Sequence, residues 1–268
     1  MPEGTKFASE YPREKAEDSD HELILFPRDV EYRKGLFPQG VFEHPAKNNI
    51  YLTLELVRHL THPGDKIIDP FAGTGTLMLA CLESRDVMLV ELEAHYANLI
   101  RVAWSEISLK PECKGQLSLR IGDCRQVLMN MKETFDSAIF SPPFSTSITR
   151  AKALPSVASQ IEGFTKDAQN MANLNVFLFE QAMGTVFERV ARRIRPGGSM
   201  GIISRDIIRG PGRVHLSEGI IRRSKKAGFN LTEWWKWKPP GSAQRAIQES
   251  RGARVVKDED ILLFRKEA

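Results

Sequence analysis

The sequence predicts an α/β fold in which a doubly wound, mostly parallel sheet carries an antiparallel edge hairpin. From Lys66 onward, short runs of β-branched and aliphatic residues alternate with amphipathic stretches. Such alternation is typical of repeated β–α units and of a parallel sheet covered by helices on both faces. Near the C-terminus, two strand-like runs follow one another without a helix between them. That succession favours an antiparallel hairpin at the sheet edge.

The same patterns predict the elements in order. The expected strands are 66–70, 87–91, 117–122, 135–141, 199–204, 229–238 and 258–266. The expected helices are 76–84, 94–107, 124–131, 173–195 and 217–228. Pro196-Gly197-Gly198 closes the longest helical pattern, because proline and glycine both interrupt a helix. Gly228 closes the last helix in the same way.

Three segments stand outside this alternation. Residues 1–22 are polar and unperiodic, so we expect a flexible N-terminal arm. Residues 23–268 are expected to form a single domain, because the composition, 41% hydrophobic and 27% charged, is that of an ordinary globular protein. Within this domain, residues 145–172 and 239–256 are unusually long loops, and such loops are commonly functional or disordered. We expect both loops to face the substrate.

Targeting and redox signals are few. No apolar run approaches the roughly 20 residues needed to cross a bilayer, and the polar start of the chain lacks the apolar segment of a signal peptide. These features predict a cytoplasmic protein that makes no membrane contact. Cys81, Cys113 and Cys124 form no CxxC pair. We therefore expect buried, reduced thiols and no metal site.

Charge is distributed unevenly along the chain. The formal net charge is +4, but residues 186–268 contain 19 Lys and Arg against 9 Asp and Glu, which leaves −6 for the rest. A basic C-terminal third is consistent with a polyanionic partner, because lysine and arginine side chains placed on phosphates release counterions. A solvated basic face explains the charge equally well.

A glycine-rich turn, DPFAGTGT, follows the first predicted strand and opens a helix. Gly73 and Gly75 allow the backbone to pack against a ligand, and the helix that follows offers free N–H groups. Glu91 and Asp123 end the next two strands, at the same carboxyl edge as Asp69, where open α/β folds bind ligands. Carboxylates at these positions can accept hydrogen bonds from ribose hydroxyls and from an adenine amino group.

Two other readings of this turn are open. A GxG turn can simply tighten a strand-to-helix joint. An NAD site would place carboxylates similarly, but it would require GxGxxG, and Gly75 is followed by Thr76, Leu77 and Met78.

The turn resembles that of class I S-adenosylmethionine-dependent methyltransferases, and DPFAGTGT is close to the form found in DNA amino-methyltransferases. The resemblance implies a Rossmann-like fold and S-adenosylmethionine as cofactor. It also implies that Asp69 belongs to the cofactor site, that Phe71, Gly73 and Gly75 line the cofactor, that Glu91 holds its ribose and that Asp123 holds its adenine.

Upstream of the turn, HPAKNNIYLTLELV resembles the family segment that meets the methionine part of the cofactor. Lys47 would then pair with the cofactor carboxylate through a charge-assisted hydrogen bond. The family commonly has a proline soon after this lysine, whereas this chain has Asn48-Asn49. A solvated lysine is the alternative.

After the fourth predicted strand comes Ser141-Pro142-Pro143-Phe144. Two prolines cannot continue a strand ladder, and they fix the backbone so that the preceding carbonyls project rigidly. The motif resembles the catalytic signature of amino-methyltransferases. By that resemblance the Ser141 hydroxyl and the Pro142 carbonyl accept hydrogen bonds from an exocyclic amine, which makes its nitrogen a better nucleophile. Phe144 would stack on a base rotated out of the duplex.

The resemblance, which covers residues 36–266, implies a site-specific DNA methyltransferase, and serine before Pro-Pro favours cytosine N4 over adenine N6. It also leaves room for a companion restriction endonuclease, as in restriction-modification systems. Methylation of RNA at guanine N2 or adenine N6 would use the same site geometry. A decayed methyltransferase that only binds nucleic acid or cofactor is the non-enzymatic alternative.

Contacts with nucleic acid would come from the two long loops. The basic residues expected to make them, each of which could equally be a solvated loop charge, are Arg150, Lys152, Arg245, Arg251 and Arg254.

Overall fold

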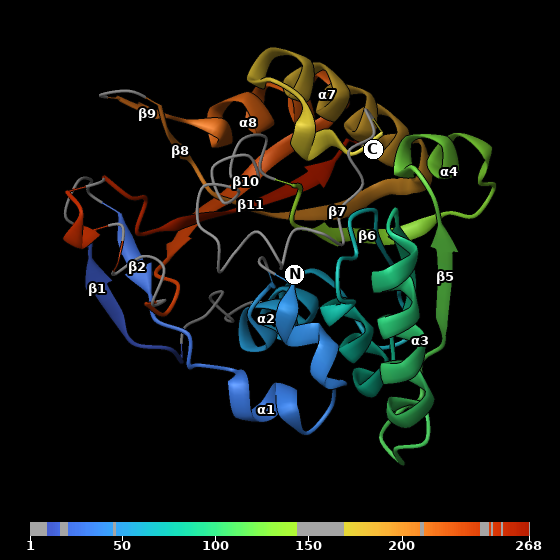
Figure 1. Ribbon diagram of the computed structural model, residues 1–268. Helices are drawn as coiled ribbons and strands as arrows, with labels where there is room; N and C mark the ends of the chain where they lie inside the picture. Colours follow the sequence, from blue (N-terminus) through green and yellow to red (C-terminus); the bar gives the residue numbers. More distant parts are fainter. Residues whose placement is uncertain are drawn as a thin grey trace.

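The computed structural model describes residues 10–16, 21–44, 47–143, 169–209, 212–241, 247, 249–252 and 254–267. Its centre is one mixed sheet of nine strands in the order β1-β2-β10-β11-β7-β6-β3-β4-β5 (Figure 1). The strands are β1 (Arg13–Lys15), β2 (Glu22–Ile24), β3 (Lys66–Asp69), β4 (Asp86–Glu91), β5 (Leu117–Ile121), β6 (Phe135–Phe140), β7 (Ile194–Ser204), β10 (Phe229–Trp237) and β11 (Glu259–Lys266). A separate two-stranded hairpin pairs β8 (Ile207–Arg209) with β9 (Gly212–Val214).

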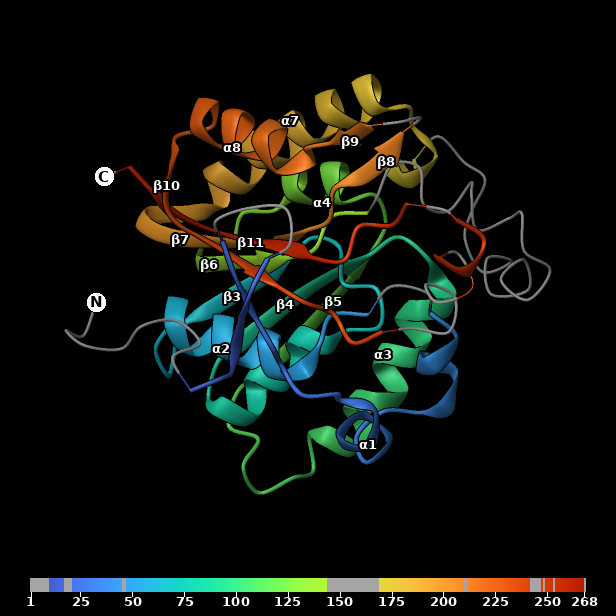
Figure 2. The ribbon, with the colours of Figure 1, turned by 90° about the vertical axis from the view of Figure 1, so that its left-hand side faces the viewer.

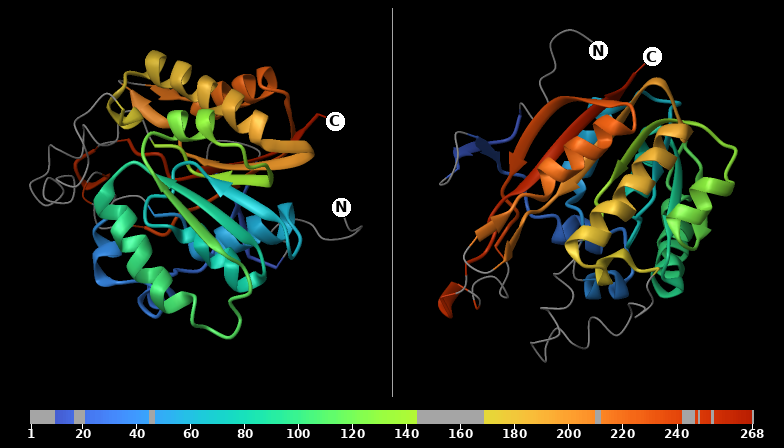
Figure 3. Two further views of the ribbon diagram at one scale, coloured as in Figure 1. Left: turned by 90° about the vertical axis from the view of Figure 1, so that its right-hand side faces the viewer. Right: turned by 90° about the horizontal axis from the view of Figure 1, so that it is seen from above.

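Helices cover both faces of the sheet (Figures 2 and 3). On one face lie α4 (Cys124–Asn130), α7 (Val176–Arg193) and α8 (Leu216–Lys226), preceded by the short 3-10 helix η3 (Met171–Asn173). On the other lie α1 (Val30–Lys34), α2 (Ile50–Leu60), α3 (Ala94–Ile107) and the 3-10 helices η1 (Gln39–Glu43) and η2 (Thr76–Glu83). Each face has its own apolar core, because the strands between them point alternate side chains up and down.

Local sequence explains why the helices form and end where they do. Asn49 accepts a hydrogen bond from the Leu52 amide and caps α2, and Asn175 caps α7 through the Leu178 amide. In α3, buried residues recur at helical spacing from Tyr96 to Ile107 and face the sheet.

The predicted fold class is confirmed, and each predicted strand and helix from residue 66 to residue 266 has a counterpart in the structure. Two predictions differ in detail. The segment after the glycine turn is the 3-10 helix η2, and Pro196-Gly197-Gly198 lies inside β7 rather than closing the long helix, because α7 already ends at Arg193. The antiparallel hairpin is β10 and β11, with β11 inserted between β7 and β10. The two strands beyond it were not predicted: β2 pairs in parallel with β10, and β1 pairs with β2. Residues 13–15, expected to belong to a loose arm, are therefore attached to the sheet, and Arg13 forms an ion pair with Glu22.

The strand order creates a switch point beside β3. After β3 the chain adds β4 and β5 on one side, and it then returns to add β6 and β7 on the other. In open α/β sheets the carboxyl ends of strands at such a point border a ligand crevice. In the parts of the chain that the structure describes, no helix combines the length and apolarity that a bilayer crossing requires.

Gly75 is the residue through which the turn after β3 packs on the core. Its φ is +78°, and a Cβ added there would lie 2.7 Å from Met78 Cε and 2.8 Å from Ile100 Cγ1. We expect Gly75→Ala to lower the free energy of unfolding by about 1–2 kcal/mol for the left-handed backbone and by a further ~1–3 kcal/mol for overpacking. Gly64→Ala is the matched control, because Gly64 has φ +93° but open space around it, so only the backbone cost applies. Urea unfolding measures the free energy of unfolding of the two variants. Equal losses in the two variants would contradict the packing argument.

Candidate active site

Four neighbouring strands of the sheet end in polar residues at the same edge. Asp69 ends β3 and Glu91 ends β4. Asp123 follows β5, and Ser141 follows β6. Because all four strands are parallel, their carboxyl ends meet on one side of the molecule. The sequence-predicted cofactor residues and catalytic residues are therefore brought to one edge.

The glycine turn folds over the end of β4. The Ala72 amide donates to the Val90 carbonyl at 3.0 Å, and the Gly75 amide donates to the Ala72 carbonyl at 2.7 Å. Gly73 adopts φ +54°, a conformation that glycine reaches without strain. Its amide donates to Glu91 Oε2 at 2.6 Å. The turn and the carboxylate at the end of β4 are thus one hydrogen-bonded unit.

Two carboxylates are buried within this unit. Asp69 is 4% exposed and accepts a hydrogen bond from the Phe71 amide at 2.8 Å, whereas Glu91 also accepts from the Glu93 amide at 2.9 Å. Burial raises the pKa of Asp69 to about 8 and that of Glu91 to about 7, against the opposing effect of these hydrogen bonds. The charge of Glu91 raises the pKa of Asp69 further, and the charge of Glu93 does the same for Glu91.

Asp123 caps α4 and pairs with Arg125. It accepts from the Arg125 amide at 2.8 Å, and its carboxylate pairs with the Arg125 guanidinium at 2.7 Å. Both carboxylate oxygens accept from this one arginine. The predicted contact of Asp123 with an adenine amino group would therefore share these oxygens with Arg125, and it stays a prediction.

Lys47 lies in a segment that packs beside the glycine turn. Its ammonium group donates to the Phe42 carbonyl at 3.1 Å and to the His44 carbonyl. The His44 ring contacts the Tyr96 ring with centroids 4.5 Å apart, and its Nε2 lies 3.4 Å from where a Cβ on Gly73 would be. Burial, followed by the charge of Arg33, lowers the pKa of Lys47 to about 8. The lysine is therefore partly desolvated, unlike a freely solvated surface lysine.

The predicted catalytic segment begins directly after β6. Phe140 is fully buried, and its ring packs against the Phe71 ring of the glycine turn with centroids 5.7 Å apart. Pro142 is buried, whereas Ser141 and Pro143 are half-buried. Its neighbour Phe140 thus holds Ser141 beside the glycine turn. Phe144 lies outside the described residues.

The structure describes two of the five residues predicted to contact nucleic acid. Arg150, Lys152 and Arg245 lie outside the described residues. Arg251 and Arg254 are exposed in the segment before β11. Their contact with nucleic acid stays a prediction.

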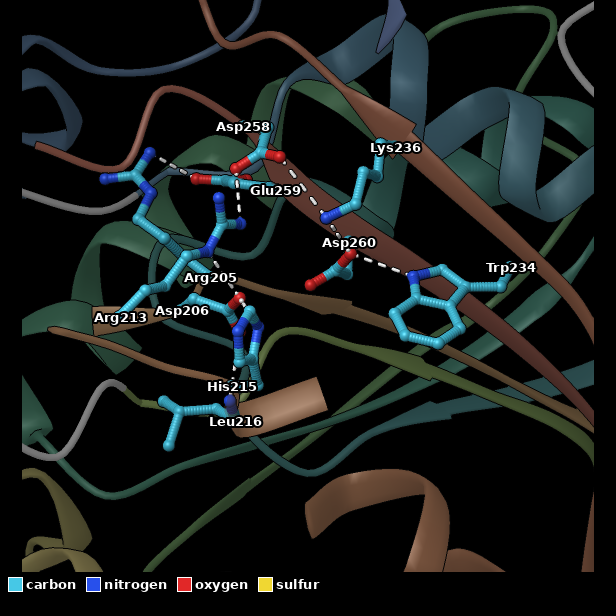
Figure 4. A network of polar contacts seen from close by, with 10 residues as sticks. All are labelled: Arg205, Asp206, Arg213, His215, Leu216, Trp234, Lys236, Asp258, Glu259 and Asp260. Atoms are coloured by element: carbon cyan, nitrogen blue, oxygen red, sulfur yellow. Dashed lines mark hydrogen bonds and ion pairs between the residues drawn. The ribbon is translucent and has the colours of Figure 1, made fainter. Parts of the chain in front are cut away.

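A buried ionic network at the ends of β7, β10 and β11 was not predicted (Figure 4). Asp260 accepts from the Trp234 indole N–H at 2.8 Å and from the Lys236 ammonium at 2.7 Å. Asp258 links Lys236 to Arg213. Its members are far apart in the sequence and form no motif, so no local signal could have revealed it.

The same network holds the hairpin that follows β7. Arg213 on β9 pairs with Asp206 at 2.7 Å, and Asp206 also accepts from the Leu216 amide at the start of α8 and pairs with His215 (Figure 4). Arg205 pairs with Glu259. Breaking a buried ion pair by removing one partner typically costs about 3–5 kcal/mol. The network therefore holds the β8–β9 hairpin near the carboxyl end of β7, on the side of Ser141 that is away from the glycine turn.

A second unpredicted contact joins the end of the first long loop to the cofactor residues. Asn170 is buried, and its amide group donates to Glu93 Oε1 at 3.5 Å, two residues after Glu91. The Arg125 guanidinium donates to the Gln169 carbonyl, also at 3.5 Å. The described end of the predicted substrate-facing loop thus contacts residues that follow β4 and β5, close to the predicted cofactor residues Glu91 and Asp123.

Several polar groups surround the glycine turn. They are a partly desolvated ammonium, that of Lys47, and the carboxylates of Asp69, Glu91 and Asp123. Across the described ranges, no group of three or more His, Cys, Asp or Glu side chains is placed to hold a metal ion.

Comparison with known proteins supports the family and the fold separately. The family model described as DNA methylase matches residues 7–102, a stretch that includes Lys47, the glycine turn and Glu91. No curated protein matches the chain significantly.

Among solved structures, an S-adenosylmethionine-dependent methyltransferase from Methanosarcina mazei is 10% identical, with a TM-score of 0.53 over 79% of this chain and 97% of the other. TrmN from Thermus thermophilus is 14% identical, with a TM-score of 0.51 over 83% of this chain, which spans 50% of the TrmN chain. Precorrin-8W decarboxylase from Methanobacterium thermoautotrophicum is 11% identical, with a TM-score of 0.50 over 83% of this chain and 92% of the other. Identities this low establish the fold alone. The described chain therefore has the class I methyltransferase fold, and its residues 7–102 carry the sequence pattern of the DNA methylase family.

Proposed function

We propose that this protein is an S-adenosylmethionine-dependent methyltransferase that modifies the exocyclic amine of a base in DNA, with cytosine N4 favoured. One observation carries the proposal: Ser141 and Pro142 lie at the end of β6, packed through Phe140 and Phe71 onto the glycine turn. An amine acceptor and a cofactor turn are therefore adjacent at one sheet edge.

Three described residues would each bind a different part of the cofactor. Glu91 would accept hydrogen bonds from the ribose, Asp123 from the adenine amino group, and Lys47 would pair with the methionine carboxylate. S-adenosylmethionine, when bound, supplies a methyl carbon activated by a positive sulfur.

The catalytic segment acts on the base. The lone pair of an exocyclic amine is delocalised into the ring, so the nitrogen is a poor nucleophile. The Ser141 hydroxyl and the Pro142 carbonyl would accept its N–H groups and favour a pyramidal nitrogen. Rigid placement of the amine by Pro142 and Pro143 contributes further, because orientation lowers the entropic part of the barrier.

The substrate is tested by incubating the protein with methyl-labelled S-adenosylmethionine and, separately, duplex DNA, single-stranded DNA and RNA. The labelled nucleoside is then identified. We expect N4-methylcytosine from DNA. Label only in N6-methyladenine would correct the base, label only in RNA would correct the polymer, and transfer to none of them would favour a non-catalytic binding protein.

Ser141→Ala tests the catalytic segment. Loss of one hydrogen bond that strengthens in the transition state lowers kcat by about 10²–10³ in comparable sites, whereas the affinity for the cofactor should stay unchanged. Single-turnover transfer and calorimetric binding measure the two effects. Ser137→Ala is the control, because Ser137 lies on the same strand but bonds to Ser199 inside the sheet. A Ser141→Ala variant with the wild-type rate would exclude the proposed role.

Cofactor affinity should depend on pH between two limits. Ligand hydrogen bonds to Glu91 require its ionised form, so affinity should fall below its pKa of about 7. Pairing with Lys47 requires its protonated form, so affinity should fall above its pKa of about 8. Beyond each limit, the cofactor affinity should fall by up to about tenfold per pH unit.

Calorimetric titrations with S-adenosylhomocysteine across this range measure the profile. Glu91→Gln should remove the acid limit, and Lys47→Met the alkaline limit. Asp69, whose pKa is also about 8, faces Glu91 and is the competing source of an alkaline change. An alkaline fall that survives Lys47→Met would assign it to Asp69 and contradict the role of the lysine.

A further inference from the structure

Arg33 is a charged side chain buried almost completely beside the glycine turn. It is 1% exposed and belongs to α1, a helix of five residues. Neither a motif nor the local pattern singles it out, since it lies in the polar stretch VEYRKG. A helix this short is not stable alone, so its position depends on contacts such as those of Arg33.

The guanidinium group joins three separate parts of the chain. It donates to Thr76 Oγ1 at 3.1 Å, to the Asn48 carbonyl at 2.6 Å and to Asp29 Oδ2 at 2.6 Å. Thr76 is the first residue of η2, immediately after Gly75, and Asn48 is the residue after Lys47. Arg33 therefore connects the glycine turn directly to the lysine segment.

Asp29 extends the same connection to α2. Its Oδ2 atom also accepts a hydrogen bond from the Ile50 amide at 3.0 Å. The Asn49 side chain donates to the Pro27 carbonyl at 2.8 Å. No proline fixes the backbone from Lys47 to Ile50. The lysine bonds to the carbonyls of the preceding segment, and the contacts of the three residues after it tie that segment to α1 and, through Arg33, to the glycine turn.

Burying a guanidinium in this way is costly unless its charge is matched. The desolvation penalty for an ion amounts to several kcal/mol, and it is offset only by close pairing and hydrogen bonds. A hydrophobic side chain of similar volume would usually hold α1 at least as well. We therefore attribute the burial of an arginine here to the relative placement of the segments that it joins, and not to added stability.

We propose that Arg33 is a positioning residue of the cofactor site. It holds the Lys47 segment at a fixed distance from the glycine turn, so that the two can bind the same ligand. The inference rests on the proposed function for the identity of that ligand. Arg33 does not itself need to touch the cofactor.

Arg33 also acts on Lys47 through its charge. The positive guanidinium lowers the pKa of Lys47, in the same direction as burial, whereas the carboxylate of Asp29 raises it. Removing the charge should raise the pKa of the lysine. The alkaline limit of cofactor binding should then move to higher pH.

Arg85 offers a matched control at the other end of η2. It is also buried, and it bonds to a threonine, with Nε donating to Thr61 Oγ1 at 3.2 Å and another nitrogen to the Thr61 carbonyl at 3.1 Å. It also donates to the Glu83 carbonyl at the end of η2. Arg85 thus anchors the same helix by similar contacts, but away from the turn.

The test compares Arg33→Met, Arg33→Lys and Arg85→Met in the full chain. Calorimetry gives the Kd for S-adenosylhomocysteine across the pH range, and hydrogen exchange without ligand reports on the amides of residues 72–78. Arg33→Met should weaken binding about tenfold or more, the scale of one charge-assisted hydrogen bond, speed exchange at the turn and shift the alkaline limit upward. Arg33→Lys should keep the alkaline limit and recover part of the affinity. Arg85→Met should lower the melting temperature similarly, with a Kd within about twofold of the wild type.

Two results would overturn the inference. One is an Arg33→Met protein whose Kd and pH profile match those of Arg85→Met. The other is unchanged exchange at residues 72–78, which counts against the inference whether or not the ligand binds. A wild-type protein that binds no S-adenosylhomocysteine would instead defeat the proposed function, and exchange that is faster in Arg33→Met alone would still support the anchoring.

Discussion

The hydrogen bond from the Gly73 amide to the buried Glu91 carboxylate is the contact on which the rest of the site depends. It ties the turn after β3 to the end of β4, so two strand ends become one rigid surface. Gly75 then packs this surface against Met78 and Ile100 in the core. Burial raises the pKa of Glu91, and the hydrogen bonds from the Glu93 and Gly73 amides oppose that rise. The contact that joins the two strand ends therefore also contributes to the ionisation of the carboxylate.

The strand order divides the carboxyl edge into two halves. On the side of β3, β4 and β5 lie the glycine turn and the carboxylates predicted to hold a cofactor, and on the side of β6, β7, β11 and β10 lie the predicted catalytic segment and the ionic network. The chain reverses between β3 and β6, so the two halves meet where Phe71 packs on Phe140. Under the proposed function, each half would hold one of the two reactants, and their adjacency would lower the entropic part of the barrier.

Local patterns were sufficient to predict the strands of the main sheet and the longer helices from residue 66 onward, because burial on a strand or helix leaves a period in the sequence. They did not predict the β8–β9 hairpin, whose strands are three residues each. They were also sufficient to place Asp69, Glu91, Asp123 and Ser141 at one edge, because parallel strands end on the same side. Contacts between distant segments leave no such period. The pairing of β2 with β10 and the network of Asp206 and Arg213 depend on residues that only the folded chain brings together.

Two arginines hold separate parts of the carboxyl edge, the buried Arg33 beside the glycine turn and the half-buried Arg213 on β9 of the β8–β9 hairpin. Each pairs with carboxylates that are themselves largely buried, Asp29 for the first and Asp206 and Asp258 for the second. Salt screens buried pairs much less than it screens exposed charges. Contacts with nucleic-acid phosphates, in contrast, weaken steeply as salt rises, because they depend on counterion release. The scaffold of the edge should therefore stay intact at ionic strengths that weaken any contact with a polyanion, so salt would separate loss of a nucleic-acid contact from loss of the fold.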